Sequence, residues 1–127
     1  MHNEEFYNIR SYLGMSQKQL SYLLCVSTKA IQNFEQGRRK ILVSAERQLL
    51  FLLSHKKQLA KDNKPCWEIK KCSVEWRENC NAWEFKVGNL CWFINGTFCE
   101  GKPQGSWAKK INICRDCRVF KLKLPAV

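Results

Sequence analysis

Hydrophobic residues in the first sixty positions recur with helical spacing, and polar residues divide them into short segments. One apolar face spans residues 4–13, and Gly14 follows as a helix end. A second apolar face begins just after Ser16. The pattern therefore predicts a bundle of short helices, and the positions that define the first two faces are Phe6, Ile9, Leu13, Leu20, Leu23 and Leu24.

The stretch from Met15 to Arg39 predicts two helices joined by a tight turn. Ser16 is followed three residues later by Gln19, the spacing of a reciprocal capping box. After a turn at residues 25–27, Ser27 caps a second helix from Thr28 to about Gln36. Gly37 then stands where a left-handed residue commonly ends a helix.

The second of these helices has few apolar residues, so most of its surface is expected to face outward. Ala30, Ile31 and Phe34 suit packing against the bundle. Amide and ammonium groups match the donors and acceptors of base edges in the major groove of DNA. The outward residues, which we take as candidates for DNA contact, are Thr28, Lys29, Gln32, Asn33 and Gln36. Arg38, Arg39 and Lys40 follow directly and are candidates for phosphate contacts.

Another helix is expected from Ser44, as its cap, to about Lys61. Phe51 and Leu52 point away from the apolar face of this helix. They form either a contact between two subunits or a docking face for a second domain. The residues that suit the core are Leu49, Leu50, Leu53 and Leu59.

Residues 5–60 resemble the Xre/Cro type of phage-repressor helix-turn-helix. The resemblance rests on Gln17, Leu20-Ser21, Val26-Ser27, Ile31, Phe34-Glu35, Gly37 and Arg39. It implies that Gln17 contacts a phosphate, that Thr28, Lys29, Gln32 and Asn33 contact base edges, and that Arg10 pairs with Glu35. Cys25 is a departure, because the family usually has glycine there and a side chain in a left-handed turn is strained.

The charge of the chain favours an anionic polymer as partner. There are 22 Lys and Arg residues against 11 Asp and Glu residues, for a net charge of +11. Both halves are basic. The polar start and the short apolar run at residues 49–53 predict neither a secretory signal nor a membrane span. We therefore expect a cytoplasmic protein, nucleoid-associated when bound to DNA, in which cysteines serve metal or redox chemistry better than disulfides.

Composition changes after residues 62–65, which break the helical pattern. All five tryptophans and seven of the eight cysteines follow. A short segment with so few aliphatic residues needs a metal or crosslinks to hold its fold. The predicted organisation is a DNA-binding domain at residues 1–61, a linker at 62–65, a cysteine-rich domain at 66–121 and a tail at 122–127.

The seven cysteines of this half are the candidate metal ligands. Cys114 and Cys117 are the strongest pair, because a C-x-x-C turn directs two thiolates at one ion. CWEI at Cys66–Ile69 recurs as CWFI at Cys91–Ile94, which indicates a half-repeat. The tryptophans are expected as core and as cover for the metal site. The other candidate ligands are Cys66, Cys72, Cys80, Cys91 and Cys99.

The cysteine-rich half resembles the bacterial two-CW domain. The matching pattern is Cys66-Trp67, Cys72, Cys80, Cys91-Trp92, Gly96-Thr97-Phe98-Cys99, Gln104-Gly105, Lys110 and Cys114-x-x-Cys117-x-x-Phe120. Cys80-Asn81 departs from the Cys-Pro that is usual there. The occurrence of this domain in signalling and regulatory proteins implies a sensor.

Two cofactors fit four-cysteine ligation, namely zinc and a 4Fe–4S iron-sulfur cluster. The wide spacing and the single C-x-x-C disfavour a zinc ribbon, so the cluster is our preference. Three cysteines would remain as packing residues or as an oxidisable thiol pair.

The fold class we predict is a mainly α N-terminal domain, a phage-repressor-like helix-turn-helix bundle of four to five helices, plus a small irregular metal-stabilised cysteine-rich domain. The function expected is a transcription regulator, a homodimer on double-stranded operator DNA, that senses redox state or metal. The alternatives are a DNA-tethered thiol, redox or electron-transfer protein, and an adaptor that binds a protein partner and holds a structural zinc. No Cys-His, Ser-His or paired-carboxylate constellation indicates an enzyme.

Overall fold

The computed structural model describes residues 1–56, 65–86, 88, 90–94, 97, 99 and 105–124. Within these residues the chain is mainly helical, and no strand is formed. It divides into two compact units, Met1–Gln58 and Leu59–Leu124. Each unit is described by itself. The expected linker residues 62–64 and the last three residues of the expected tail lie outside the described part.

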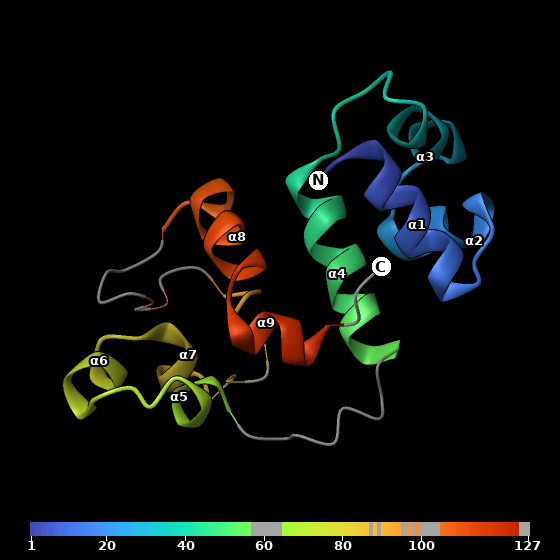
Figure 1. The fold of residues 1–127 in the computed structure, drawn as a ribbon. Coiled ribbons are helices and arrows are strands. Elements are labelled where there is room, and N and C mark those ends of the chain that lie inside the picture. Colours follow the sequence, from blue (N-terminus) through green and yellow to red (C-terminus); the bar gives the residue numbers. More distant parts are fainter. Residues whose placement is uncertain are drawn as a thin grey trace. The chain divides into compact units, whose positions relative to one another are not determined.

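The first unit contains four helices in the order expected from the hydrophobic pattern (Figure 1). They are α1 (Asn3–Leu13), α2 (Gln17–Leu24), α3 (Thr28–Glu35) and α4 (Val43–Lys56). Helix α1 packs against α3 and α4, and α2 packs against α3. The apolar faces of all four helices therefore meet in one core.

Local signals at the helix ends confirm several predictions. Ser16 and Gln19 form the reciprocal capping box, with Ser16 Oγ accepting from the Gln19 N–H at 3.1 Å and Gln19 Oε1 accepting from the Ser16 N–H at 2.9 Å. Ser27 Oγ caps α3 by accepting from the Ala30 N–H at 3.0 Å. Gly37 adopts a φ of 72°, the left-handed conformation expected after α3.

Two expectations about the bundle are wrong. Leu23 was expected on the apolar face of α2, but its side chain is 46% exposed, because the eight-residue helix buries only Leu20, Ser21 and Leu24. Ser44 was expected as a helix cap, but α4 begins at Val43, and the Glu46 N–H donates to the Leu42 carbonyl at 3.0 Å. The described part of α4 ends at Lys56, so the expected extension to Lys61, with Leu59, is outside the described residues.

The core of the first unit consists of the predicted apolar positions with few additions. Phe6 and Phe34 join α1 to α3 through an edge-to-face contact, with ring centroids 5.6 Å apart. Phe51 and Leu52 are half-buried, and the Phe51 ring lies 4.4 Å from the His55 ring. The side chains buried in this core are Phe6, Ile9, Leu13, Leu20, Leu24, Ala30, Ile31, Phe34, Ile41, Ala45, Leu49, Leu50 and Leu53.

The second unit consists of short helices separated by loops. They are α5 (Cys66–Ile69), α6 (Val74–Glu78), α7 (Asn81–Glu84), α8 (Trp107–Arg115) and α9 (Arg118–Lys123). Its described apolar cluster is small, with Ala82, Cys91 and Val119 at the centre. Residues 122 and 123 were expected in a tail but complete α9. Cysteines and tryptophans thus join the few buried aliphatic residues of this unit.

None of the described helices combines the length and the apolar character that crossing a membrane requires.

Candidate functional site

The outer surface of α3 is polar because the helix buries only three side chains. Ala30, Ile31 and Phe34 are at most 5% exposed and fix its inner face. Each residue predicted to contact bases is at least partly accessible. Lys29 and Gln36 are exposed, and Thr28, Gln32 and Asn33 are half-buried. The helix therefore presents amide, hydroxyl and ammonium groups along one side.

A polar network fixes the end of α3 against α1 and α2. The Arg10 guanidinium donates from Nε to Glu35 Oε1 and from Nη2 to Glu35 Oε2, the second at 3.2 Å. Arg10 also donates from Nη1 to the Met15 carbonyl at 2.9 Å. The Arg10–Glu35 pair expected from the resemblance is therefore confirmed. The network sets the angle of α3 with side chains that are largely buried.

Gln17, expected at a phosphate, has a partner inside the unit. Its Nε2 donates to Glu35 Oε2 at 2.8 Å. The Glu35 carboxylate thus accepts from both Arg10 and Gln17 and links the start of α2 to the end of α3. Neither this bond nor any other contact tests the phosphate role.

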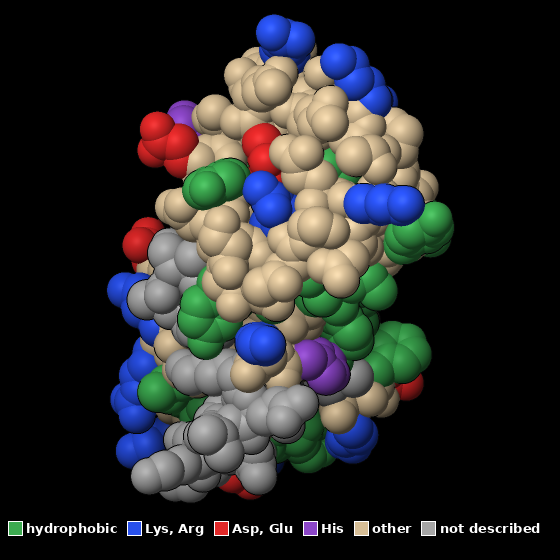
Figure 2. All heavy atoms as spheres, turned by 90° about the vertical axis from the view of Figure 1, so that its right-hand side faces the viewer, with side chains coloured by type: hydrophobic (Ala, Val, Ile, Leu, Met, Phe, Trp, Pro, Cys, Tyr) green, Lys and Arg blue, Asp and Glu red, His purple; other side chains and the backbone are tan. Residues whose placement is uncertain are grey.

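The basic segment after α3 is exposed at all three positions. Arg38, Arg39 and Lys40 are accessible, although the Arg39 guanidinium lies 5.7 Å from the Phe34 ring centroid, as in a cation–π contact. Figure 2 shows lysine and arginine side chains at the upper end of the face it draws, the end at which Figure 1 places α3 and the loop after it. This end of the unit is therefore positively charged.

Cys25 ends α2 in a left-handed conformation, with φ 55° and ψ 40°. The side chain is exposed, and its Sγ lies 3.9 Å from the Tyr22 carbonyl oxygen. The turn geometry expected of glycine is therefore kept by a cysteine, which bears the strain of that conformation.

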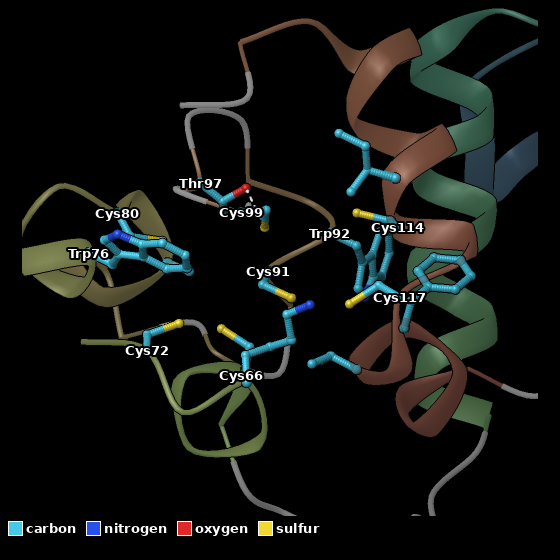
Figure 3. Close-up of a pocket in the computed structure, with 15 residues that line it drawn as sticks. Cys66, Cys72, Trp76, Cys80, Cys91, Trp92, Thr97, Cys99, Cys114 and Cys117 are labelled. Carbon is cyan, nitrogen blue, oxygen red and sulfur yellow. Dashed lines mark hydrogen bonds between the residues drawn. The ribbon is translucent and has the colours of Figure 1, made fainter. Parts of the chain in front are cut away.

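All seven cysteines of the second unit line one cavity (Figure 3). Cys114 and Cys117 approach from one side, Cys72 and Cys80 with Trp76 from the other, and the remaining three lie between them. The other lining residues are mostly apolar, among them Ala82, Val119 and Phe120. Cysteines that are far apart in sequence are thus gathered at one place.

The α8–α9 turn positions the C-x-x-C pair. Cys114 is buried in the last turn of α8, and Cys117 immediately precedes α9. The Cys117 N–H donates to the Cys114 carbonyl at 2.9 Å, which closes the turn between the two residues. The pair was the strongest sequence candidate, and both members face the cavity.

The two Cys-Trp repeats meet at their cysteines. The thiols of Cys66 and Cys91 interact electrostatically, and both lie in the same part of the cavity (Figure 3). The Cys66 N–H also donates to the Gly88 carbonyl at 3.0 Å, which holds the first repeat beside the segment that leads into the second. The half-repeat in the sequence therefore corresponds to two motifs that lie close together.

Burial raises the pKa of four of the cavity thiols, Cys72, Cys91, Cys99 and Cys114. It raises the pKa of Cys114 to about 12, and the nearby Lys110 ammonium opposes this shift. Burial likewise raises the pKa of Cys99, and the Thr97 hydroxyl and Lys110 oppose it. For Cys91, interaction with the Cys66 thiol and then burial raise the pKa well above its ordinary value. Thiolate ligation in this cavity thus needs added positive charge, such as a metal supplies.

Three polar groups lie in or beside the lining of the cavity, those of Thr97, Lys110 and Trp92. Thr97 Oγ1 accepts from Lys110 Nζ at 2.7 Å and from Cys99 Sγ at 3.4 Å. The Lys110 side chain is fully buried. Trp92, also fully buried, lines the cavity, and its indole N–H has no acceptor among the described residues. Sequence reasoning expected Trp92 as cover for the site but missed Lys110 and Thr97 as functional groups, although all three belong to the two-CW pattern.

The tryptophans divide between two environments. Trp92 and Trp107 are buried, and Trp76 and Trp92 line the cavity, in agreement with a role as core and cover. Trp67 and Trp83 instead pack edge to face, with centroids 4.9 Å apart, and Lys86 Nζ lies 3.2 Å from the Trp83 ring centroid. A cation already covers that ring face, which disfavours base stacking there.

The dimensions of the cavity favour an occupant of several atoms. The space open to the centres of water-sized atoms is about 50 Å³, several times the roughly 10–15 Å³ that one water needs. Tetrahedral zinc would hold thiolate sulfurs only about 3.8 Å apart. Among the described residues, no three potential ligands are gathered at the spacing of a single ion.

No family model, curated protein or solved structure matches this chain.

Proposed function

We propose that this chain is a bacterial transcription regulator that reads operator DNA through its first unit and holds a metal–thiolate centre in its second. An iron-sulfur cluster is favoured over zinc, and the centre senses redox state or metal. The protein acts in the cytoplasm as a homodimer on two half-sites, as helix-turn-helix proteins commonly do. The observation that carries the DNA-binding proposal is the polar outer side of α3, held by the Arg10–Glu35 pair.

The arrangement of α2 and α3 supports recognition in the major groove. Gln32 and Asn33 carry amides that pair in bidentate fashion with adenine, and Lys29 suits guanine. The exposed residues Arg38–Lys40 follow directly and supply sequence-independent attraction to phosphates. Base-reading and phosphate-binding groups thus adjoin one another along the chain.

The cavity of the second unit supports the metal centre. Seven thiols, an apolar lining and the unsatisfied indole N–H of Trp92 suit an electron-rich group that is ligated by sulfur. The small apolar cluster of this unit gives an independent reason to expect a structural contribution from such a group. Bound metal would therefore stabilise the unit as well as report a signal.

The test of DNA reading compares two double variants in a selected-operator binding assay. Gln32→Ala with Asn33→Ala should lose about 1–3 kcal/mol of discrimination for each good base contact removed. Arg38→Ala with Arg39→Ala should weaken binding to every sequence alike. It should also reduce the slope of log affinity against log salt concentration by about one for each phosphate contact that is lost. If the first variant keeps the full sequence preference, α3 does not read bases.

The test of the centre is anaerobic purification followed by absorption spectroscopy and analysis of iron, sulfide and zinc. A brown protein that contains iron and sulfide supports the cluster, whereas a colourless protein that contains zinc would show that the centre is a zinc site. Loss of the metal with unchanged operator affinity would favour an adaptor over a sensor. Turnover of a thiol or redox substrate would favour the DNA-tethered redox protein.

A further inference from the structure

Lys110 is a buried cation without an anionic partner inside the described part of the protein. Its side chain is fully buried in the second unit, and its Nζ donates to Thr97 Oγ1 at 2.7 Å. No carboxylate among the described residues pairs with it. Burying an ammonium without a countercharge is strongly destabilising. Such a residue needs negative charge nearby.

Three cavity thiols interact electrostatically with the Lys110 ammonium. Lys110 acts on Cys91, Cys99 and Cys114, the last two of which also interact with Cys117. Cys72, by contrast, interacts chiefly with Cys80 and Cys99 and has Lys70 and Arg77 as its nearby cations. The geometry agrees, because Cys99 Sγ and Lys110 Nζ both donate to Thr97 Oγ1 and Cys114 follows Lys110 by about one turn of α8. We therefore take Cys91, Cys99 and Cys114, with Cys117 as the neighbour of Cys114 in the C-x-x-C turn, as an inner group.

Two other hydrogen-bond donors belong to residues that line the cavity. Thr97 lines the cavity, and its oxygen already accepts from Lys110 and Cys99, which leaves its own O–H proton to donate. The indole N–H of Trp92 is buried in the lining without an acceptor among the described residues. Hydrogen bonds to ligating sulfurs and to the cluster are among the levers that set the redox potential of such centres.

We infer that Lys110 is the fixed positive countercharge of an anionic thiolate centre ligated by Cys91, Cys99, Cys114 and Cys117. This inference rests on the metal centre of the proposed function. Lys110 is a positioning residue: it acts through Thr97 and through its charge and does not ligate. Because a cation stabilises the more negative, reduced form, Lys110 raises the reduction potential of the centre.

The experiment compares Lys110→Met with Lys109→Met in full-length protein that is purified anaerobically. Both variants lose one charge from α8, but Lys109 is exposed. The first readout is iron, sulfide and zinc per chain, with the rate of metal loss to a chelator. For an iron-sulfur centre, a spectroelectrochemical titration with dithionite as the one-electron donor gives the reduction potential.

We expect Lys110→Met to lose its metal at least tenfold faster than Lys109→Met. We also expect the reduced-to-oxidised ratio at a fixed potential to fall at least tenfold, equivalent to about 59 mV for one electron. Indistinguishable behaviour of the two variants in both measurements would overturn the inference. Wild-type protein that takes up neither zinc nor iron with sulfide would overturn the metal centre, and this inference with it.

If Lys110→Met takes up no metal, Lys110→Arg tells whether the charge or the shape of the side chain is needed, because it keeps the charge. Recovery of the centre in Lys110→Arg supports a requirement for charge. Failure of Lys110→Arg as well would assign Lys110 to the shape of the fold and overturn the inference. Cys72→Ser and Cys80→Ser should keep the metal content of the wild type, whereas Cys99→Ser and Cys114→Ser should lose it. The reverse pattern would contradict the ligand assignment.

Discussion

Gly88 lies so close to Cys66 that the two residues leave no room for a side chain between them. The Gly88 carbonyl accepts from the Cys66 N–H at 3.0 Å. A Cβ atom at residue 88 would lie 2.4 Å from Pro65 Cβ and 2.9 Å from the Cys66 nitrogen. The first Cys-Trp motif is therefore held in place by a backbone contact that only glycine permits.

Gly88→Ala should displace α5 and move the Cys66 thiol away from Cys91. Overpacking of this kind costs about 1–3 kcal/mol of unfolding free energy. Tryptophan fluorescence measures the effect, because all five tryptophans belong to the second unit and the three tyrosines to the first. Gly105→Ala is the matched control, since nothing lies within 4 Å of a Cβ there. Equal unfolding midpoints for the two variants would contradict the close approach.

Arg10→Met should destabilise the first unit, because it leaves the largely buried Glu35 carboxylate without its charged partner. We expect a loss of about 2–3 kcal/mol, typical of a hydrogen-bonded charge that loses its partner. The measurement is thermal unfolding by circular dichroism, with the tryptophan transition as internal reference. Arg38→Met removes an exposed arginine and should leave the midpoint unchanged. A similar midpoint for Arg10→Met would show that the pair contributes little.

Cys25→Gly should stabilise the first unit by relieving the left-handed strain at φ 55°. The gain is about 0.5–1 kcal/mol, since the strain of roughly 1–2 kcal/mol is partly offset by the greater freedom of glycine in the unfolded chain. Chemical denaturation that is followed by circular dichroism gives the difference. Cys25→Ala keeps a Cβ atom and should show no gain, so equal effects of Gly and Ala would argue against strain.

Removal of metal should unfold the second unit and leave the first intact. The described apolar cluster of the second unit is small, whereas the first has a continuous core from α1 to α4. Anaerobic treatment with a chelator should therefore shift tryptophan emission to the red while the helix signal of the first unit persists. A second unit that keeps its native tryptophan emission without metal would show that its apolar contacts suffice.

The first unit could be predicted closely because its signals are local. The capping box at Ser16 and Gln19, the left-handed Gly37 and the buried Phe34 all follow from residues within one or two helical turns. Leu23 was misplaced because periodicity alone does not tell how wide a buried face is. The start of α4 was misplaced because Ser44 is a good cap that the chain does not use.

For the second unit, the sequence indicated the kind of site but not its arrangement. Irregular cysteine spacing indicates metal chemistry, but it does not tell which thiols meet, because loops between short helices decide that. The approach of Cys66 to Cys91 depends on Gly88. The burial of Lys110 runs against the usual exposure of lysine. Such a residue becomes informative only when its surroundings are known.

The hydrogen bond from Gln17 to Glu35 bears on how the first unit would meet a phosphate. The Gln17 amide nitrogen has two N–H groups, and Glu35 accepts only one of them. The side chain is thereby fixed before DNA arrives, with the second N–H available. Immobilising a flexible side chain on binding costs about 0.5–1.5 kcal/mol, and folding has already met that cost here. Glu35 would thus strengthen the contact between Gln17 and DNA without touching the DNA itself.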